Sequence, residues 1–390
     1  MDVKPFAIHI PESTLTDLQQ RLALTRWPED IADSAWSYGA NLRYMQEIVS
    51  YWQTRFDWRS QEHAINRFSQ FRGEVDGLAI HFIHERGKGS EPFPLIITHG
   101  WPGSFVEMLK IIPRLTDPVS HGGDAADSFD VVIPSLPGYG FSDRATQVGM
   151  NAFRIAELWA ELMAGLGYGC FGAQGGDWGA SVTTCLGLMY PASVAGVHLN
   201  YIPGSFKPYL GPGSRSLSET ESAFLQAQES WWQTEGGYAH VQATRPKTLA
   251  FGLNDSPAGL AAWIIEKFRD WSDCDGDVER RFTKDELLTN VMIYWATQTI
   301  HSSMRLYYEA RRRPLHFTEG ESVQVPCAVA RFLKEAPFPP REWIERGYNV
   351  QRWTEFASGG HFAAMEEPDL LVEDMRAFFR PLRQSSHQMD

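Results

Sequence analysis

Five residues, Gly175-Gly176-Asp177-Trp178-Gly179, decide the fold that this chain is expected to adopt. They match the pattern G-x-Nuc-x-G of a sharp strand-to-helix turn, in which most chains carry serine as the nucleophile. Glycine is needed two residues either side, because a side chain there would collide with the neighbouring strand or helix. An aspartate side chain has a reference pKa of about 3.9 and is an anion at neutral pH, whereas serine must first be deprotonated. The pattern therefore predicts that Asp177 attacks saturated carbon.

The flanking sequence favours this turn over a simpler alternative. The alternative is a glycine-rich loop in which Asp177 caps the helix that follows. Residues 166–173 are typical of a short strand of small residues, residues 180–190 are typical of a helix, and Pro191 would end that helix. This order, strand then turn then helix, is the context that the nucleophile turn requires.

Composition limits the kinds of function. The chain has 390 residues, of which 43% are hydrophobic, so it can bury a large core divided into two or three lobes. Its net charge of −13 argues against a nucleic-acid or anionic-membrane surface and favours a soluble enzyme for an uncharged ligand. The cysteines have no C-x-x-C spacing, so we expect neither disulfides nor a zinc site: Cys170, Cys185, Cys274 and Cys327.

The amino-terminal residues contain no apolar segment of the kind found in secretory signals or membrane anchors. Together with the cysteine pattern, this predicts a soluble, cytoplasmic protein with no membrane attachment. A homodimer is plausible because two-fold dimers are the commonest assemblies of soluble chains.

Hydrophobic patterning predicts an α/β fold. Residues 13–25 and 41–57 have the spacing of amphipathic helices, and Asp76-Gly77 is a hairpin signature between strands at 71–76 and 78–84. Apolar strands then alternate with helices, which predicts a mostly parallel sheet with helices on both faces. Further strands are expected at 94–98, 129–133, 166–173, 325–332 and 348–355, with helices at 105–115, 153–166 and 367–379.

Strand patterns are absent from residues 203–320, where aromatic-rich helical stretches take over. The stretches expected to be helical are 219–234, 257–271, 284–300 and 303–312. A helical block between strands of one sheet predicts a lid. We therefore expect an N-terminal extension at 1–90 that packs on the core, an α/β-hydrolase core at 91–204 and 320–384, and an inserted helical lid at 205–319.

Two further segments carry residues suited to catalysis. The stretch HGWPG at 99–103 follows a predicted strand, where an α/β-hydrolase supplies one backbone N–H to its oxyanion hole. The residue after the nucleophile supplies the other N–H, so the expected donors are Trp101 and Trp178; a Gly-Pro turn without a role is the alternative. His361 follows the last predicted strand, and Glu335 follows the strand before it, which gives the order nucleophile, acid, histidine.

Several segments together resemble epoxide hydrolases of the microsomal-type branch, and the resemblance covers nearly the whole chain. The segments are PFAIHIPESTLTDLQQRLALTRWPED (5–30), HGWPG, GGDWG, FLKEAPFPP (332–340) and GGHFAAMEEP (359–368). The resemblance implies hydrolysis of an epoxide through an ester on Asp177. It also implies two lid tyrosines that bind the epoxide oxygen. Segment 236–263 places the first at Tyr238 and segment 302–312 places the second at Tyr307, with Tyr308 as a competing match.

The implied enzyme needs no metal or organic cofactor, and its expected partner is a small apolar or aryl epoxide. The lid tryptophans favour such a substrate, although they could equally be lid core: Trp231, Trp232, Trp263, Trp271 and Trp295. The family's membrane-bound members carry an N-terminal anchor that this chain lacks, which implies a soluble relative. Two alternatives are a haloalkane- or haloacid-type dehalogenase of the same fold and a non-catalytic ligand-binding homologue.

Other suggestive patterns fail on context. The G-x-G-x-x-G match at 167–172 precedes and enters a strand, which argues against dinucleotide binding. His81 and His84 lie on one predicted strand and face opposite ways, so they cannot share a metal. The acidic segment 273–277 lacks the glycine position and final glutamate of a calcium loop and is expected to be a solvated turn. The arginines at 311–313 are expected to form an exposed helix end.

Overall fold

The fold is built on one nine-stranded sheet, seen in a computed structural model that describes residues 1–335 and 337–383. The strand order is β1-β2-β3-β5-β4-β6-β7-β8-β9; pairing is antiparallel from β1 to β5 and parallel from β5 to β9. This confirms the predicted fold class. The strands are β1 (Val3–Phe6), β2 (Gln70–Val75), β3 (Leu78–Glu85), β4 (Phe93–Thr98), β5 (Phe129–Pro134), β6 (Phe171–Gly175), β7 (Val194–Leu199), β8 (Val323–Phe332) and β9 (Tyr348–Phe356).

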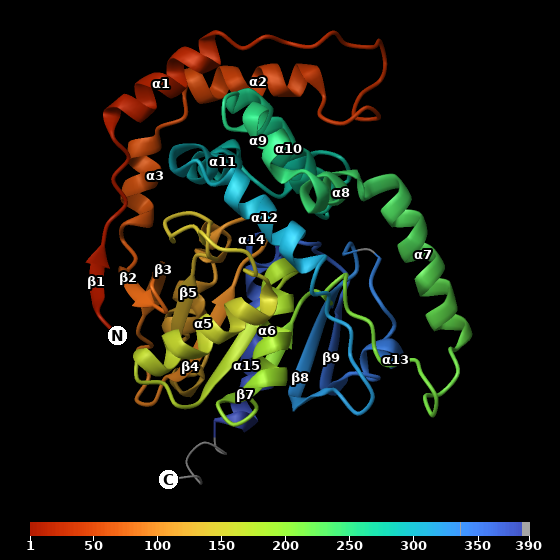
Figure 1. The fold of residues 1–390 in the computed structure, drawn as a ribbon. Helices are drawn as coiled ribbons and strands as arrows, with labels where there is room; N and C mark the ends of the chain where they lie inside the picture. Colours follow the sequence, from red (N-terminus) through yellow and green to blue (C-terminus); the bar gives the residue numbers. More distant parts are fainter. Residues whose placement is uncertain (336, 384–390) are drawn as a thin grey trace.

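Helices cover both faces of this sheet (Figure 1). Two neighbouring residues of β7 show this. A Cβ atom at Gly196 would lie 3.0 Å from the Phe378 ring, and the side chain of Val197, the next residue, lies against Gly187. Phe378 belongs to α15 and Gly187 to α6, and successive strand residues point to opposite faces, so these two helices lie on opposite sides. The helices that flank the sheet are α4 (Ile112–Thr116), α5 (Ala152–Gly165), α6 (Asp177–Met189) and α15 (Pro368–Phe379).

Two predicted elements were wrong in their extent. The helix expected at 105–115 is a 3₁₀ turn (Phe105–Met108) followed by the short α4, because Pro113 cannot donate a hydrogen bond within a continuous helix. The strand expected at 166–173 begins only at Phe171. Residues before it end α5 instead: Gly167 adopts φ +90°, and the Tyr168 N–H bonds to the Met163 carbonyl.

Three helices precede the hairpin: α1 (Glu12–Ala23), α2 (Leu42–Thr54) and α3 (Trp58–Ile65). The predicted hairpin is confirmed, with Asp76 at φ +44° and Gly77 at φ +75°, the two left-handed residues of a type I′ turn. While β1 joins the sheet, α1 and α2 lie against helices inserted much later in the chain (Figure 1).

That later block is the helical insertion, which we define as residues 200–322 between β7 and β8. It lies above the carboxyl ends of the parallel strands (Figure 1). Its helices are α7 (Glu219–Glu235), α8 (Gly237–Thr244), α9 (Pro246–Leu253), α10 (Pro257–Asp270), α11 (Lys284–Thr297) and α12 (Ile300–Ala310). After it come the short α13 (Arg341–Ile344) and α14 (Ala363–Glu366).

Within the described residues, no helix has both the length and the apolar character needed to cross a bilayer.

Candidate active site

The turn that carries Asp177 joins β6 to α6 and is as tightly packed as the sequence predicts. A Cβ atom at Gly175 would lie 2.3 Å from the Gly179 carbonyl group, and one at Gly179 would lie 1.8 Å from the Thr98 oxygen. Only glycine fits at either position. Asp177 itself has φ +48°, a left-handed conformation that costs free energy in a residue with a side chain and is typical of functional turns.

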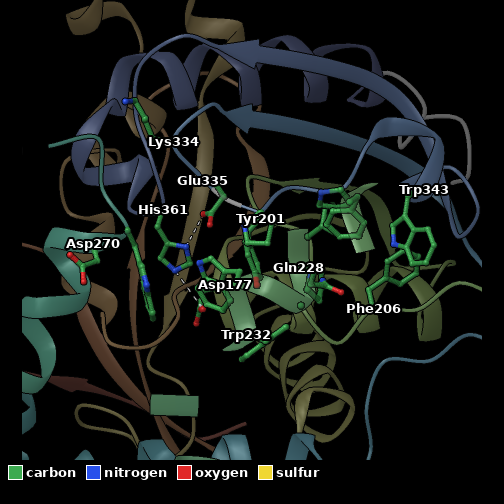
Figure 2. A pocket seen from close by; sticks show the side chains of 18 of the residues that line it. Asp177, Tyr201, Phe206, Gln228, Trp232, Asp270, Lys334, Glu335, Trp343 and His361 are labelled. Carbon is green, nitrogen blue, oxygen red and sulfur yellow. Dashed lines mark hydrogen bonds and ion pairs between the residues drawn. The ribbon is translucent and has the colours of Figure 1, made fainter. Parts of the chain in front are cut away.

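His361 and Glu335 lie beside Asp177, although they come from distant parts of the chain. Glu335 follows β8 and His361 follows β9, so both reach the edge of the sheet where β6 ends (Figure 2). His361 Nδ1 donates to Glu335 Oε2 over 2.7 Å, and its Nε2 lies 3.5 Å from Asp177 Oδ2. The exposed fraction of the side chain is 8% for His361 and 19% for Asp177. One imidazole therefore contacts two carboxylates in a largely buried site.

The two carboxylates set the charge of His361. Burial alone would lower the pKa of His361, but the negative charges of Glu335 and Asp177 together raise it well above its usual value. Both carboxylates therefore favour the protonated form of His361 in the resting site. Loss of either negative charge would lower the pKa of His361 again.

The HGWPG loop follows β4 and reaches the other oxygen of Asp177. The Trp101 backbone N–H donates to Asp177 Oδ1 over 2.7 Å. Trp178 is the second residue of α6, so its N–H has no carbonyl partner within that helix. Of the two N–H groups predicted to form an oxyanion hole, that of Trp101 thus contacts Oδ1 and that of Trp178 lacks a helical partner, while Oδ2 lies on the His361 side.

Helix α11 holds this loop in place, which the sequence did not reveal. The Tyr294 hydroxyl donates to the Gly103 carbonyl over 2.6 Å, and Asn290 Nδ2 donates to the Pro102 carbonyl over 2.8 Å. These two residues are four positions apart and share one helix face. The sequence offered one indication of this role, the amide side chain of Asn290 within the mainly apolar stretch LLTNVMIYW (287–295).

Both predicted tyrosines of the insertion face this site. The Tyr238 ring stacks on Trp101 with centroids 5.4 Å apart, and the Tyr307 ring lies edge-on to Trp178 at 4.8 Å. The tyrosine rings are themselves 5.8 Å apart. Tyr308 lies elsewhere, with its ring 3.3 Å from the guanidinium of Arg312. Of the two competing matches, only Tyr307 reaches the site.

Burial and the charge of Asp177 raise the pKa of Tyr238 and the pKa of Tyr307 above the usual tyrosine value. Both hydroxyls therefore remain protonated at neutral pH. They are available as hydrogen-bond donors to an oxygen placed between them and Asp177.

Two cavities meet at Asp177 from the side of the insertion. One, of about 140 Å³, is bordered by His361 and by aromatic side chains (Figure 2). The other, of about 640 Å³, extends along α8 and α12 past Tyr307. Of the five tryptophans singled out in the insertion, three line the first cavity, Trp231, Trp232 and Trp271; neither Trp263 nor Trp295 lines either of the two.

The loop that carries His361 is tied to the insertion through residues 271–273. The His361 N–H donates to the Trp271 carbonyl over 2.9 Å, and Asp273 Oδ2 accepts from the Gly359 N–H over 3.0 Å. Arg281 pairs with the same carboxylate over 2.7 Å. The prediction of a solvated turn was wrong for Asp273, whose side chain is only 13% exposed.

The other histidines singled out in the sequence have structural partners. His81 contacts Ser135 and Gln70, whereas His84 contacts Tyr168, so the two do not converge. Among the described residues, no group of histidine, cysteine or acidic side chains could hold a metal. Residues 311–313 are exposed at the end of α12, as predicted.

Comparison with known proteins agrees with this geometry. The family model "Epoxide hydrolase N terminus" matches residues 3–108, and the model "alpha/beta hydrolase fold" matches residues 94–299. A protein of Stigmatella aurantiaca, provisionally named an epoxide hydrolase, is 48% identical over 98% of this chain and 86% of its own length. Epoxide hydrolase 1 of Sus scrofa is 39% identical over 98% of this chain and 89% of its own length.

Solved structures give the same result. The crystal structure of juvenile hormone epoxide hydrolase from Bombyx mori superimposes with a TM-score of 0.84 at 32% identity, covering 98% of this chain and 94% of that one. Aspergillus niger epoxide hydrolase also gives 0.84, at 30% identity, covering 98% and 97%. The chain therefore belongs to the epoxide hydrolase family of α/β-hydrolase enzymes.

Proposed function

We propose that this enzyme hydrolyses epoxides to vicinal diols in two steps, through a covalent ester on Asp177. The supporting observation is the position of the Asp177 carboxylate, with Oδ1 held by the Trp101 N–H and Oδ2 3.5 Å from His361 Nε2. Oδ1 is thereby positioned to become the carbonyl oxygen of the ester, and Oδ2 is free to attack an epoxide carbon. The route requires no metal ion or organic cofactor.

In the first step, Asp177 Oδ2 forms a bond to one epoxide carbon while the bond from that carbon to the ring oxygen breaks. The leaving oxygen would be a strongly basic alkoxide. Tyr238 and Tyr307 donate hydrogen bonds to it and supply its proton, which is the role that their neutral hydroxyls and mutual proximity support. The product is an alkyl ester of Asp177 with a neighbouring hydroxyl group.

After the first step, His361 is no longer held by the Asp177 charge and gives its proton back to the tyrosine that protonated the leaving oxygen. In the second step, the neutral His361 takes a proton from water, and the resulting hydroxide attacks Cγ of the ester. Glu335 orients the imidazole and stabilises its positive charge through the 2.7 Å hydrogen bond. The Trp101 and Trp178 N–H groups stabilise the oxyanion, each donor contributing about 3 to 4 kcal/mol in comparable sites. As the Cγ–Oδ2 bond breaks, His361 returns its proton to the departing oxygen, which releases the diol with one former carboxylate oxygen. Asp177 keeps the oxygen that came from water, and its new carboxyl group gives its proton to His361 to restore the resting site.

The cavities support an apolar or aryl epoxide as the substrate. Phe224, Trp231 and Trp343 border the cavity of about 140 Å³, so a ring or alkyl arm attached to the epoxide would be buried against aromatic side chains.

We also propose a division of the chain into three parts. Residues 1–90 form an N-terminal extension, residues 91–204 and 320–384 form the α/β-hydrolase core, and residues 205–319 form a lid over that core.

Two further proposals concern the state of the protein. The four cysteines are unpaired, which supports a reducing compartment such as the cytoplasm. A homodimer is the assembly that we propose, and sedimentation velocity would test it.

The function is tested by incubating the enzyme separately with styrene-type, alkyl and polycyclic epoxides and with haloalkanes, measuring diol formation and halide release. Diol formation without halide release is the expected result. Halide release alone would favour a dehalogenase, and tight epoxide binding without turnover would favour a non-catalytic homologue.

A further inference from the structure

A second carboxyl group, that of Glu107, is buried beside the proposed catalytic residues but has no part in the mechanism above. Glu107 lies on the 3₁₀ turn Phe105–Met108, directly after the HGWPG loop, and is only 8% exposed. A Cβ atom at Gly103 would lie 1.3 Å from Glu107 Oε1, so this glycine leaves the space that the carboxyl group occupies. Among the described residues, the Glu107 carboxyl group interacts with the Ser104 backbone N–H but has no lysine or arginine partner. A buried carboxyl group without an opposite charge beside it is costly and calls for an explanation.

Glu107 borders a small cavity of about 20 Å³, large enough for one water molecule. Asp177 and His361 border this cavity and also the larger aromatic cavity described above. The two cavities therefore meet at the carboxylate that would carry the ester. A substrate arm in the aromatic cavity leaves the small cavity free beside His361.

The small cavity also contains a buried acceptor without a partner. Gln174 Nε2 donates to Asn200 Oδ1 over 2.8 Å, but Gln174 Oε1 is buried and accepts no hydrogen bond from any described residue. Two more polar side chains border this space: His99, whose ring nitrogens contact the Gly100 carbonyl and the Leu136 N–H, and Asn200, whose Oδ1 accepts from Gln174 Nε2. The polar groups left to bind a molecule in the cavity are thus Gln174 Oε1, the Glu107 carboxyl group, the Asn200 NH₂ group and the His361–Asp177 pair.

We propose that Glu107 and Gln174 hold the water molecule that attacks the Asp177 ester, in the small cavity beside His361. The proposal rests on the two-step function argued above. A water molecule has two donors and two acceptor lone pairs. It would donate to His361 Nε2 and to Gln174 Oε1 and accept from the Glu107 carboxyl O–H. Its second lone pair then faces Cγ of the ester, and its proton passes to His361 as the new C–O bond forms. Glu107 is a water-positioning residue in this scheme.

The electrostatic environment keeps Glu107 protonated. Burial raises the pKa of Glu107 to about 8; the positive charge of His361 opposes this rise and the negative charge of Asp177 adds to it. Tyr294, on α11, faces Glu107 as a neutral hydroxyl, and α14 contributes Glu366, whose own pKa is raised to about 7 by burial. While protonated, the carboxyl group can donate a hydrogen bond. Once deprotonated at alkaline pH, it becomes an anion next to the developing oxyanion, so the hydrolysis step should slow at alkaline pH.

The test separates the two steps by rapid quench and mass spectrometry of the full-length enzyme with styrene oxide. Replacing Glu107 by Leu should slow ester hydrolysis by roughly 10- to 100-fold, the effect of losing one buried hydrogen bond to a reacting group, while alkylation changes little. Glu107→Gln should rescue hydrolysis at neutral pH and remove its decline at alkaline pH. Gln174→Met should slow hydrolysis in the same way as Glu107→Leu.

Glu62→Gln is the matched control, because Glu62 is also a buried carboxyl group but contacts Trp58 and Arg59 far from this cavity. It should leave both rate constants unchanged. Equal losses of alkylation and hydrolysis in the Glu107 variants, or an alkaline decline that persists in Glu107→Gln, would overturn the water site. Absence of any covalent adduct in the unaltered enzyme would instead refute the two-step function itself, so the two failures are distinguishable.

Discussion

At the scale of single residues, the arrangement around His361 links the two proposed steps. In the resting site, Asp177 and Glu335 both raise the pKa of His361. Alkylation converts the Asp177 carboxylate to a neutral ester and removes one of these charges. The pKa of His361 then falls, so the imidazole can lose its proton and act as a base only after the ester has formed. The first step thereby prepares the second.

Replacing His361 by Gln should trap the ester. The glutamine cannot accept a proton from water, so hydrolysis should slow by about 10²- to 10⁴-fold, the usual contribution of a general base, while alkylation still occurs. Intact-protein mass spectrometry after mixing with an epoxide should show one added substrate mass, located on the peptide containing Asp177. A protein that remains unmodified although it binds the epoxide would contradict this order of events.

The two tyrosines of the helical insertion should act on the first step. Tyr238→Phe and Tyr307→Phe each remove one hydroxyl donor and should slow alkylation by roughly 10- to 100-fold, the effect of about 1 to 3 kcal/mol. Tyr308→Phe is the control, since its ring lies against Arg312 rather than the site. Stopped-flow tryptophan fluorescence would follow the alkylation rate. Equal effects of the variants at 307 and 308 would show that the assignment to Tyr307 is wrong.

The sequence was informative about some of these residues and not about others. Asp177, Glu335 and His361 could be placed because each follows a strand in a parallel sheet, and such loops meet at one edge. Tyr307 and Tyr308 could not be separated, because neighbouring helical residues point about 100° apart and only the packing of α12 decides which one faces inward. Glu107 carried no signal, because its importance arises from burial.

At the scale of elements, α11 stabilises the loop that carries one of the two proposed oxyanion-hole donors, the Trp101 N–H. Its residues Asn290 and Tyr294 satisfy the carbonyl groups of Pro102 and Gly103, which would otherwise be buried without partners. From the sequence alone, α11 was expected to be one of several lid helices. Contacts between residues 188 and 191 positions apart have no local pattern that could have revealed this connection.

Weakening that contact should reduce activity without unfolding the enzyme. Asn290→Ala and Tyr294→Phe each leave a buried carbonyl group without its donor, which costs about 1 to 3 kcal/mol and lets the Trp101 N–H move away from Asp177. We expect kcat to fall by roughly 5- to 50-fold with a smaller change in KM. Thr289→Val is the control on the same helix, because the Thr289 hydroxyl is buried without a partner among the described residues. Full activity in Tyr294→Phe would show that the loop holds its position unaided.

At the scale of the whole molecule, one buried cluster joins the last helix to the sheet. Asp374 on α15 accepts hydrogen bonds from His198 on β7 over 3.0 Å and from Arg352 and Thr354 on β9 over 2.7 and 2.6 Å. Burial alone would raise the pKa of Asp374, but these partners lower it to about 2. The carboxylate is thus charged in the folded protein at pH values where the unfolded chain would already bind a proton.

The sign of the resulting pH dependence follows from that lowered pKa. The stabilisation from Asp374 is fully present above pH 4, close to the unfolded value, and is lost as the pH falls towards 2; it amounts to about 2 kcal/mol. Asp374→Asn should lower the free energy of unfolding at pH 7 and flatten its decline between pH 4 and pH 2. Urea unfolding at a series of pH values would measure both effects. If the free energy of unfolding of the variant declined between pH 4 and pH 2 as steeply as that of the unaltered protein, this account would be contradicted.

The overall architecture was predictable because the alternation of strands and helices and the interruption at residues 203–320 are properties of local pattern. The position of the N-terminal helices was not. Tyr51 bonds to Asp285 over 2.9 Å and Arg21 pairs with Asp255 over 2.6 Å, each across 234 residues of chain. Such contacts depend on how the insertion closes over the sheet, and nothing in the amphipathic pattern of residues 13–25 or 41–57 specifies which surface they cover.

The transfer of an oxygen atom from Asp177 to the product is the central chemical claim, and isotope labelling tests it directly. The enzyme in excess over the epoxide would be allowed a single turnover in water enriched in ¹⁸O. We expect the first diol to carry no label and the Asp177 carboxylate to acquire one ¹⁸O atom, both detected by mass spectrometry. Label found in that first diol, with none on Asp177, would mean that water attacks the epoxide directly and would contradict the account.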